Sequence, residues 1–515
     1  MSRKQFNEAI AIVMFLLMVG CASGSGSATP SDKTTQPTVA ISPSAIPATN
    51  TPTATIEPTP TAAPSATDAL SIPAPETNLP QVGPVLIFKA AGKPDGEDYL
   101  WAVSQDGMSL TRLIDEPVLG FAVYPRSSLQ NGTTIVYAAR SDQGASNVTL
   151  KFLRLPGGEV RTITSLVGDT FPVELPDVAN LIRSIRSGGL EWSPGGSLLA
   201  FTGMRDDTWI NLYTYDYRGG TVTRLANQAL HALHPQWSPD GRYVVYESAQ
   251  LFGEGGTKPA GMWASKYDGS SLVWLGTAAG EGIDGRSYVQ IVGWLSNTEV
   301  ILRSASSPSY ALLGNVETGA TSLAIDELFS QVAYAPEYNV WLLSQPRDSG
   351  PGTSLILYHN GERTELPTVN IDQLWWSGDY NVFFGVDADK HLYTITPTGK
   401  ITEIPLENGW YGQLGGSYRF VASPDSSRWA WRYPGDSGAG GPAWVGEPMK
   451  QPDHLVSAGT TTRELYLSWT PDSRRIICLT DAGLYMAEAP DFQITPISTG
   501  LHAEPAADWE GVWVP

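Results

Sequence analysis

One pattern recurs along most of the chain: an aromatic residue, then a short turn sequence of Pro, Gly, Asp or Asn, then an apolar run typical of a strand. Its clearest copies read EWSPGGSLLAFTG, QWSPDGRYVVYES and SWTPDSRRIICLT. The equivalent positions that open successive units lie 40 to 57 residues apart and are Trp192, Trp237, Trp294, Tyr334, Trp376, Ala422, Trp469 and Trp509. Repeats of roughly 40 to 50 residues, each with about four short strands, are typical of propeller blades. We therefore expect an all-β propeller.

The segment Ser238-Pro239-Asp240-Gly241 could be either a ligand-binding loop or a tight turn between two strands. Pro239 presets φ for the second position of a type I turn, Asp240 suits the third position, and Gly241 suits the exit. The same place is taken by a proline in three other units, at Pro194, Pro424 and Pro471. A catalytic loop would not need copies in several blades. We therefore predict a structural turn, with Trp237 packed between blades.

The pattern W-S-P-D-G-[KR]-x-[IV] occurs at Trp237–Val244 and, in degraded form, at Trp192, Ala422 and Trp469. It resembles the TolB-like or WD-like propeller repeat, which also occurs in the propellers of the dipeptidyl-peptidase and prolyl-oligopeptidase families. The resemblance covers residues 82–515 and implies the fold, but propellers host unrelated activities. Because the chain contains no G-x-S-x-G elbow, we do not expect the hydrolase chemistry of the peptidase relatives.

The number of blades follows from the number of units. Eight positions from Tyr124 to Trp469 open complete units, whereas the earlier strands VLIFKA, YLWAVSQDG and SLTRLI lack a first strand of their own. The C-terminal AADW offers that strand, which predicts a closure in which the end of the chain completes the first blade. The total of nine exceeds the common upper limit of about eight. We therefore expect about eight blades, within a range of about seven to nine. If there are eight, one of the nine units is an insertion and not a blade. The one helix that we expect is short, around Val178 to Ile185.

The first 21 residues resemble a bacterial lipoprotein signal. A basic start at Ser2-Arg3-Lys4 precedes the apolar run Ala9–Val19, which is too short to span a bilayer comfortably, and LLMVGC then ends at Cys21. The resemblance implies cleavage before Cys21 and acylation of that cysteine, which would anchor the chain to a lipid bilayer. The alternatives are an ordinary secretory signal and an uncleaved anchor, and all three place the rest of the chain outside the cytoplasm. We expect a signal peptide at 1–20, a disordered Ser/Thr/Pro-rich tether at 21–81 and the propeller at 82–515.

The charge balance limits the range of partners. Asp and Glu number 52 against 32 Lys and Arg, which gives a net charge of −20. Such a surface repels phosphate backbones, so we expect no nucleic-acid partner. Cys478 lies in the apolar run RRIICLT, where we expect a buried, inert thiol. We also expect no cofactor and a monomeric propeller.

The order of strands within a blade sorts the connections between the two faces of the disc. If four strands a to d are antiparallel, the a-to-b and c-to-d turns share one face, and the b-to-c and d-to-a loops share the other. The first set is tight and rich in Gly, and the second set is long and varied. The long connections include residues 166–189, 203–209, 249–263, 278–288, 345–354, 407–418 and 433–444. Because binding usually resides on long loops of a rigid scaffold, we expect a site on this long-loop face, near the central channel.

Within the long loops, Arg and aromatic side chains are the main candidates, because they supply planar hydrogen bonding and stacking area to a peptide or glycan. The candidate ligand-binding residues are Arg205, Asp206, Trp209, Arg286, Arg347, Trp410, Tyr411 and Trp444. The alternative for each residue is structural: the aromatic side chains pack beneath their own loops, and the charged ones are solvated.

Three other patterns point less strongly to chemistry. Gly435–Pro442 resembles the GDSGGP around a trypsin-like nucleophile, but it carries an inserted residue and no suitable histidine motif accompanies it. His231 and His234 could share a metal ion only on a helix, and their segment runs into a strand. Asp387 and Asp389 in DADKH lack the ligand count for calcium. We therefore predict no catalytic residue and no metal site.

These observations favour a non-catalytic, membrane-tethered propeller outside the cytoplasm that binds a protein, peptide or envelope polymer through its long-loop face. The alternative is a propeller enzyme, such as a glycan or peptide hydrolase or lyase with its site at the central channel. The TolB resemblance also implies a scaffold role in an envelope complex, although a tether stands here where those proteins carry an extra N-terminal domain.

Overall fold

The computed structural model describes residues 83–515 except for 93–95, 126–131, 141–146, 170–174, 227, 255, 277–288, 305–308, 348–351, 379, 388–390, 405–419, 435–439, 449, 451–453, 457–464, 481–482 and 503–510. These residues belong to one compact unit, Asp68–Pro515. Within this described part, no helix is long and apolar enough to cross a membrane. The expected signal peptide, Cys21 and the tether lie outside the described residues.

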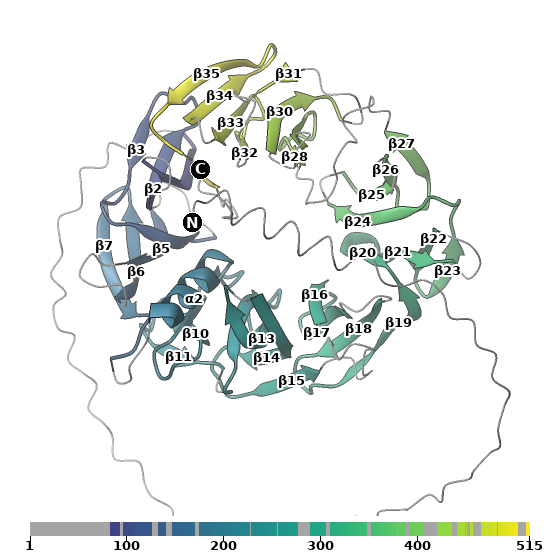
Figure 1. The fold of residues 1–515 in the computed structure, drawn as a ribbon, viewed down its shortest axis with the longest axis horizontal. Coiled ribbons are helices and arrows are strands. Elements are labelled where there is room, and N and C mark those ends of the chain that lie inside the picture. Colours follow the sequence, from purple (N-terminus) through teal and green to yellow (C-terminus); the bar gives the residue numbers. More distant parts are fainter. Residues whose placement is uncertain are drawn as a thin grey trace, which may run out of the picture. The chain divides into compact units, whose positions relative to one another are not determined.

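The described residues form nine antiparallel four-stranded sheets arranged as the blades of a ring (Figure 1). The first four blades, each given from the centre outward, are blade I with β36 (Val512–Val514), β1 (Val85–Ala91), β2 (Asp98–Ser104) and β3 (Leu110–Arg112); blade II with β4 (Val118–Val123), β5 (Thr133–Arg140), β6 (Val148–Leu155) and β7 (Glu159–Ser165); blade III with β8 (Leu190–Trp192), β9 (Leu198–Gly203), β10 (Asn211–Asp216) and β11 (Val222–Arg224); and blade IV with β12 (His231–Trp237), β13 (Tyr243–Gly253), β14 (Gly256–Lys266) and β15 (Leu272–Gly276).

The other five blades follow the same order. They are blade V with β16 (Val289–Trp294), β17 (Glu299–Ser304), β18 (Ser309–Asn315) and β19 (Thr321–Phe329); blade VI with β20 (Gln331–Ala335), the 3-10 turn η1 (Pro336–Tyr338), β21 (Val340–Pro346), β22 (Thr353–His359) and β23 (Glu362–Glu365); blade VII with β24 (Ile371–Ser377), β25 (Val382–Asp387), β26 (Leu392–Ile395) and β27 (Ile401–Ile404); blade VIII with β28 (Phe420–Ala422), β29 (Trp429–Pro434), β30 (Gly440–Gly446) and β31 (His454–Leu455); and blade IX with β32 (Leu465–Trp469), β33 (Arg475–Thr480), β34 (Gly483–Glu488) and β35 (Gln493–Ser498).

The end of the chain closes the ring. Strand β36 pairs with β1, with Val514 opposite Val85 and Val512 opposite Ile87. The prediction of a C-terminal closing strand is therefore confirmed, although the strand is VWV and the expected AADW lies outside the described residues. The blade count of nine stands at the top of the expected range, and each repeat unit forms a blade, so the expectation of an insertion is wrong.

The hydrophobic core lies between the blades. One cluster joins Leu342 and Leu355 of blade VI to Phe383 and Ile395 of blade VII, all of them fully buried. Both faces of the second strand in a blade are covered by neighbours, so β1 and β25 are buried along their whole length. The sequences of these strands are therefore mainly apolar, apart from the buried Lys89 of β1 and Asp387 of β25, whereas buried and partly buried residues alternate at the start of β2.

The Ser-Pro-Asp-Gly segment is a turn, as predicted. Gly241 has a φ of 69°, and its N–H donates to the carbonyl of Ser238 at 2.8 Å. The Ser238 hydroxyl donates to Asp240 Oδ1 at 2.7 Å, and that same oxygen accepts the N–H of Arg242 at 3.1 Å. The first of these two side-chain bonds recurs in blade VIII from Ser423 to Asp425, and in blade IX from Thr470 to Asp472. This Asp therefore holds its own turn and is not directed at a ligand.

The tryptophan before this turn links neighbouring blades. Its indole N–H donates to a carbonyl in the inner strand of the preceding blade, from Trp192 to Ala122 at 3.3 Å, from Trp237 to Glu191 at 3.0 Å, and from Trp469 to Val421 at 2.8 Å. Across the closure, the Trp513 indole donates to the Ser468 hydroxyl at 2.9 Å. The prediction that Trp237 packs between blades is confirmed.

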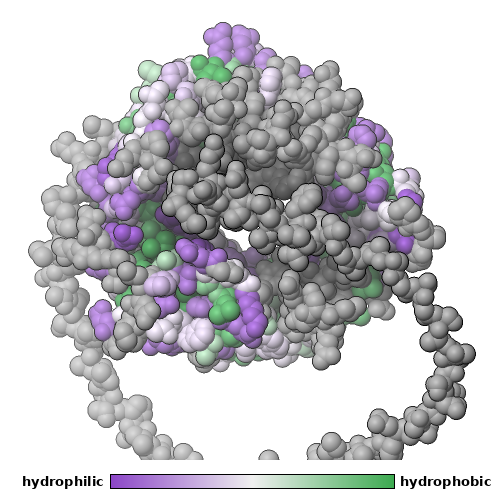
Figure 2. All heavy atoms as spheres, viewed as in Figure 1, coloured by the Kyte–Doolittle hydropathy of each residue, from purple (hydrophilic) through white to green (hydrophobic). Residues whose placement is uncertain are grey.

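The connections follow the predicted division between the two faces only in part: residues 124–132 join β4 to β5 on the face expected to be tight, whereas Ser330 alone joins β19 to β20 on the long-loop face. The segment 249–263, expected as a loop, belongs mainly to the long strands β13 and β14, which pair out to Gly253 and Gly256. The expected loop 433–444 is shorter, because β29 ends at Pro434 and β30 begins at Gly440. The longest described connection joins blades II and III and carries α2 (Leu175–Arg186), which extends the predicted helix at both ends. Figure 2 shows one side of the molecule, where hydrophilic and hydrophobic residues are mixed over the described part of the surface.

Candidate ligand-binding surface on blades III and IV

The structure brings three of the predicted binding residues together. Arg205, Asp206 and Trp209 lie in the connection between β9 and β10 of blade III, on the long-loop face. Arg347 follows β21 of blade VI, and Trp444 lies within β30 of blade VIII, so these two are on other blades. The other three predicted residues, Arg286, Trp410 and Tyr411, lie outside the described residues.

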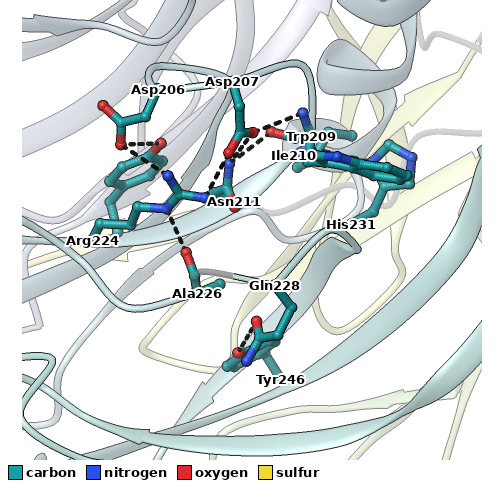
Figure 3. A network of polar contacts seen from close by, with 11 residues as sticks. Asp206, Asp207, Trp209, Ile210, Asn211, Arg224, Ala226, Gln228, His231 and Tyr246 are labelled. Atoms are coloured by element: carbon teal, nitrogen blue, oxygen red, sulfur yellow. Dashed lines mark hydrogen bonds and ion pairs between the residues drawn. The ribbon is translucent and has the colours of Figure 1, made fainter.

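The loop of blade III is held by an arginine from the outer strand of the same blade (Figure 3). Arg224 donates through Nη2 to Asp207 Oδ2 at 2.7 Å and to Asn211 Oδ1 at 2.9 Å, and its Nη1 lies 3.7 Å from Asp206 Oδ2. Its Nε donates to the carbonyl of Ala226 at 2.6 Å, which orients the guanidinium. A planar donor with this many partners leaves the loop little freedom to move.

Asp207 fixes the backbone at the tip of this loop. Its Oδ1 accepts the N–H of Trp209 at 2.9 Å and the Nδ2 amide of Asn211 at 2.7 Å. The bond to a backbone N–H two residues ahead is the Asx-turn geometry that Asp commonly stabilises in loops. Trp209 is therefore presented from a rigid backbone.

Asp206 is more accessible than Asp207. Its Oδ2 accepts a hydrogen bond from the Tyr213 hydroxyl at 3.0 Å, and its side chain is 47% exposed. Burial, and then the charge of Asp206, raise the pKa of Tyr213 well above its usual value, so the hydroxyl remains a donor at neutral pH. The guanidinium of Arg205 lies 5.5 Å from the centre of the Tyr213 ring, where a cation and an aromatic face attract each other.

The indole of Trp209 packs against the first residue of the next blade. The ring centres of Trp209 and His231 are 4.9 Å apart in an edge-to-face arrangement (Figure 3), and Phe252 of β13 lies 6.4 Å from His231. The N–H of Ile210 donates to His231 Nδ1 at 3.3 Å. Burial lowers the pKa of His231, partly opposed by the charge of Asp177 on α2, so the ring is neutral at pH 7 and can accept this bond.

We define the Trp209 surface as the side chains of Arg205, Asp206, Trp209, His231 and Phe252. Asp206 is exposed, and the other four side chains are partly exposed. Two carboxylates, Asp206 and the supporting Asp207, lie beside the guanidinium of Arg224, and the guanidinium of Arg205 lies over the Tyr213 ring. The arrangement can stack a flat or ring-shaped group on the indole and exchange hydrogen bonds with polar atoms beside it.

Sequence reasoning missed the groups that support this surface. Asp207 was not singled out, Arg224 lies on a different strand, and His231 was weighed only as a metal ligand. One signal was available, because VTRLA around Arg224 repeats LTRLI around Arg112 of blade I. The Nε of Arg112 likewise donates to a carbonyl two residues ahead, that of Ile114, at 2.9 Å.

Two further carboxylate–imidazole pairs lie outside this surface. In blade VII, Asp387 accepts a hydrogen bond from the backbone N–H of His391 at 2.8 Å, and its other carboxylate oxygen lies 3.0 Å from the imidazole Nδ1 of the same residue. That second oxygen also accepts a hydrogen bond from the Tyr393 hydroxyl at 3.0 Å. In blade IV, His234 contacts Glu247 at 3.0 Å and has a φ of 50° at a bulge of β12. Strand β12 also contains His231, so the two histidines lie on a strand, as predicted.

Other predicted features have simpler outcomes. Among the described residues, no group of three or more His, Cys, Asp or Glu side chains could hold a metal ion. Asp389 and most of the GDSG-like segment lie outside the described residues. Cys478 is fully buried in β33, and burial raises the pKa of its thiol, which agrees with the predicted inert thiol.

Comparisons with known proteins give short or distant matches. No protein-family model matches the chain. The uncharacterized protein Atu1656 of Agrobacterium fabrum is 32% identical over 81 residues, which make up 16% of this chain and 25% of that protein. Among solved structures, TolB from Acinetobacter baumannii is 17% identical, with 56% of this chain and 64% of TolB covered and a TM-score of 0.28. A eukaryotic initiation factor is 10% identical, with 84% and 98% covered and a TM-score of 0.45. Porphyromonas gingivalis dipeptidyl peptidase 4 is 13% identical, with 75% and 54% covered and a TM-score of 0.38.

A TolB and a dipeptidyl peptidase are thus among the solved structures that match, as the resemblance of the repeat led us to expect. The propeller itself rests on the nine four-stranded blades of the described chain. At these identities and TM-scores, no activity, ligand or partner carries over from the neighbours, because propellers host unrelated functions.

Proposed function

We propose that this chain is a non-catalytic binding or scaffold propeller, tethered to a membrane outside the cytoplasm, and that it recognises a protein, peptide or envelope polymer through the Trp209 surface. The signal-like N-terminus and Cys21 support the location and the lipid anchor. The Ser/Thr/Pro-rich residues up to 81 support a tether that holds the propeller away from the bilayer.

The observation that carries the binding proposal is a partly exposed tryptophan on a locked loop. Asp207 and Arg224 hold the backbone around Trp209, so a ligand would meet a surface that is already ordered. A preformed aromatic surface loses little conformational freedom on binding, and Trp and Arg are enriched among the residues that contribute most to binding energy. The loop supplies both residue types, in Arg205 and Trp209.

The proposal is tested with the full-length chain in detergent, screened on peptide and glycan libraries. For every ligand that the wild type retains, we expect Trp209→Ala to weaken binding at least about tenfold, because an aromatic anchor is lost. The matched control is Trp274→Ala, which removes another tryptophan, 39% exposed, from the outer strand β15. If Trp209→Ala and the control both retain all ligands equally, the Trp209 surface is not the binding site.

One observation favours the alternative, an enzyme. Asp387 contacts the imidazole of His391 at Nδ1, 3.0 Å away, on the long-loop side of blade VII, and a carboxylate–imidazole pair can take part in general acid–base catalysis. The test is incubation of the chain with peptide and polysaccharide libraries and analysis of products by mass spectrometry. Turnover that His391→Gln abolishes, and that Trp274→Ala leaves intact, would establish catalysis. Without turnover in the wild type, this alternative fails.

A further inference from the structure

The charges on the Trp209 surface and on the residues that support it are nearly balanced, in a chain whose net charge is −20. Asp206 and Asp207 face Arg224, whose Nη1 and Nη2 lie 3.7 Å and 2.7 Å from them, and Arg205 adds a second guanidinium. Asp177 of α2, whose charge acts on His231, is a third carboxylate, so these five groups together carry one more negative than positive charge. A surface of this kind attracts neither a polyanion nor a polycation strongly.

The polar groups of this surface suit hydroxyl groups. The Asp206 carboxylate, nearly half exposed, can accept hydrogen bonds, and the guanidinium of Arg205 can donate them. A hydroxyl both donates and accepts, so a polyhydroxylated ligand can use both side chains without carrying a charge itself. The backbone beneath them is held by Arg224 and Asp207, which keeps the spacing between acceptor and donor constant.

The indole provides the matching apolar surface. Trp209 is partly exposed and packs edge-to-face against His231 at 4.9 Å. The face of an aromatic ring carries partial negative charge, and the C–H groups of a sugar ring carry partial positive charge, so the two attract each other when stacked. The nearby Phe252 extends the apolar part of the surface.

We propose that the Trp209 surface binds a neutral oligosaccharide segment, with one sugar ring stacked on Trp209 and its hydroxyls bonded to Asp206 and Arg205. This inference rests on the binding function proposed above and names its ligand class. The charged alternatives fit less well. A basic peptide would be repelled by Arg205 and Arg224, and an anionic polymer would be repelled by the net negative charge of the chain.

The experiment uses the full-length chain in detergent and isothermal titration calorimetry. The probes are neutral hexasaccharides of glucose, mannose, galactose and N-acetylglucosamine in α and β linkages, with decalysine and hexagalacturonate as charged probes. We expect at least one neutral hexasaccharide to bind, with an affinity that Trp209→Ala lowers about tenfold and Asp206→Asn about threefold or more. Trp274→Ala is the control and leaves the affinity unchanged.

Salt separates the ligand classes. The affinity for a neutral sugar changes by less than about twofold when NaCl rises from about 0.05 to 0.5 M, because no ion pair is screened.

If no neutral hexasaccharide binds but decalysine or hexagalacturonate binds in a manner that depends on Trp209 and on salt, the sugar assignment is overturned and the binding proposal survives. If neutral sugars bind equally well to Trp209→Ala and the wild type, the assignment to this surface is overturned. If Trp209→Ala changes the binding of no probe and no library ligand, both proposals fail.

Discussion

At the scale of single residues, the repeated motif separates structure from function. Its Asp and Trp bond to the turn and to the preceding blade, so their recurrence in the sequence reports architecture. The blade III loop could be predicted in part, because Arg and Trp in a long connection signal binding. Its support could not, because Arg224 follows Asp207 by 17 residues and meets it only when β10 and β11 pair.

The indole bond between blades predicts a difference between the buried Trp237 and the partly buried Trp294. Trp237→Phe removes the hydrogen bond to Glu191, whereas Trp294 has an indole nitrogen with no partner within the described residues. Both changes lose ring area, so we expect Trp237→Phe to destabilise by about 1 kcal/mol more than Trp294→Phe. Urea unfolding of both variants measures this difference, and equal losses would show that the bond contributes nothing.

The half-buried imidazole of His231 in blade IV predicts a pH effect on stability. Burial lowers the pKa of His231, so below the unfolded-state pKa of about 6.5 the unfolded chain takes up a proton that the folded chain resists. Stability should therefore fall as pH drops through this range, and His231→Phe should reduce that fall. The measurement is the difference between unfolding midpoints at pH 7.5 and 5.0, because the variant also loses the Ile210 bond at every pH. His359→Gln, at an exposed position, should leave the difference unchanged, and an unchanged difference in His231→Phe would contradict the prediction.

At the scale of elements, strands were easier to predict than their limits. The hairpin of β13 and β14 was expected as a loop because GEGGTKPAG is rich in Gly and Pro, yet its residues pair around bulges at Ala249. Helix α2 was recognised by its apolar residues, but it begins three residues earlier than the predicted Val178. In both cases pairing or packing with distant parts of the chain decides where the element stops.

The packing of α2 predicts an effect of a single methyl group. A Cβ at Gly189 would lie 2.8 Å from the carbonyl oxygen of Ser184 and 2.5 Å from the Thr202 hydroxyl. We expect Gly189→Ala to destabilise the protein by about 1 to 3 kcal/mol, because backbone must shift to make room. Gly195→Ala is the control, since a Cβ there meets nothing within 4 Å. Thermal unfolding of both variants tests this, and equal melting temperatures would contradict the close packing.

At the scale of the whole molecule, the ring was predictable and its size was not. The repeat length identified the blades, and the missing strand near Val85 identified the closure. The number nine was set aside only because smaller propellers are commoner, and no residue argued against it. Which loops of different blades share a surface depends on the ring geometry, so the meeting of Trp209 with His231 lay beyond the sequence.

The closing strand predicts that a small deletion has a large effect. Removing residues 511–515 deletes β36, including the fully buried Val514 and the Trp513 bond to Ser468. We expect the free energy of unfolding to fall by about 3 kcal/mol or more and proteolysis to be faster. The reason is that β1 loses one of its two paired strands and blades I and IX lose the Trp513 bond between them. Removal of the exposed Pro515 alone should change stability by less than about 0.5 kcal/mol. An unchanged unfolding midpoint in the longer deletion would show that the closure is dispensable.

The pairing of β1 with β36 and β2 also determines how the ring would respond to mechanical load. The chain enters the propeller at β1, which has β36 on one side and β2 on the other, and Val85 is paired with both Val514 and Ser104. A pull on the segment before Val85, along the strand, therefore acts in shear on two rows of hydrogen bonds at once instead of unzipping one row. A force applied there would thus be resisted by two neighbours of β1, one from the N-terminal part of the chain and one from its C-terminus.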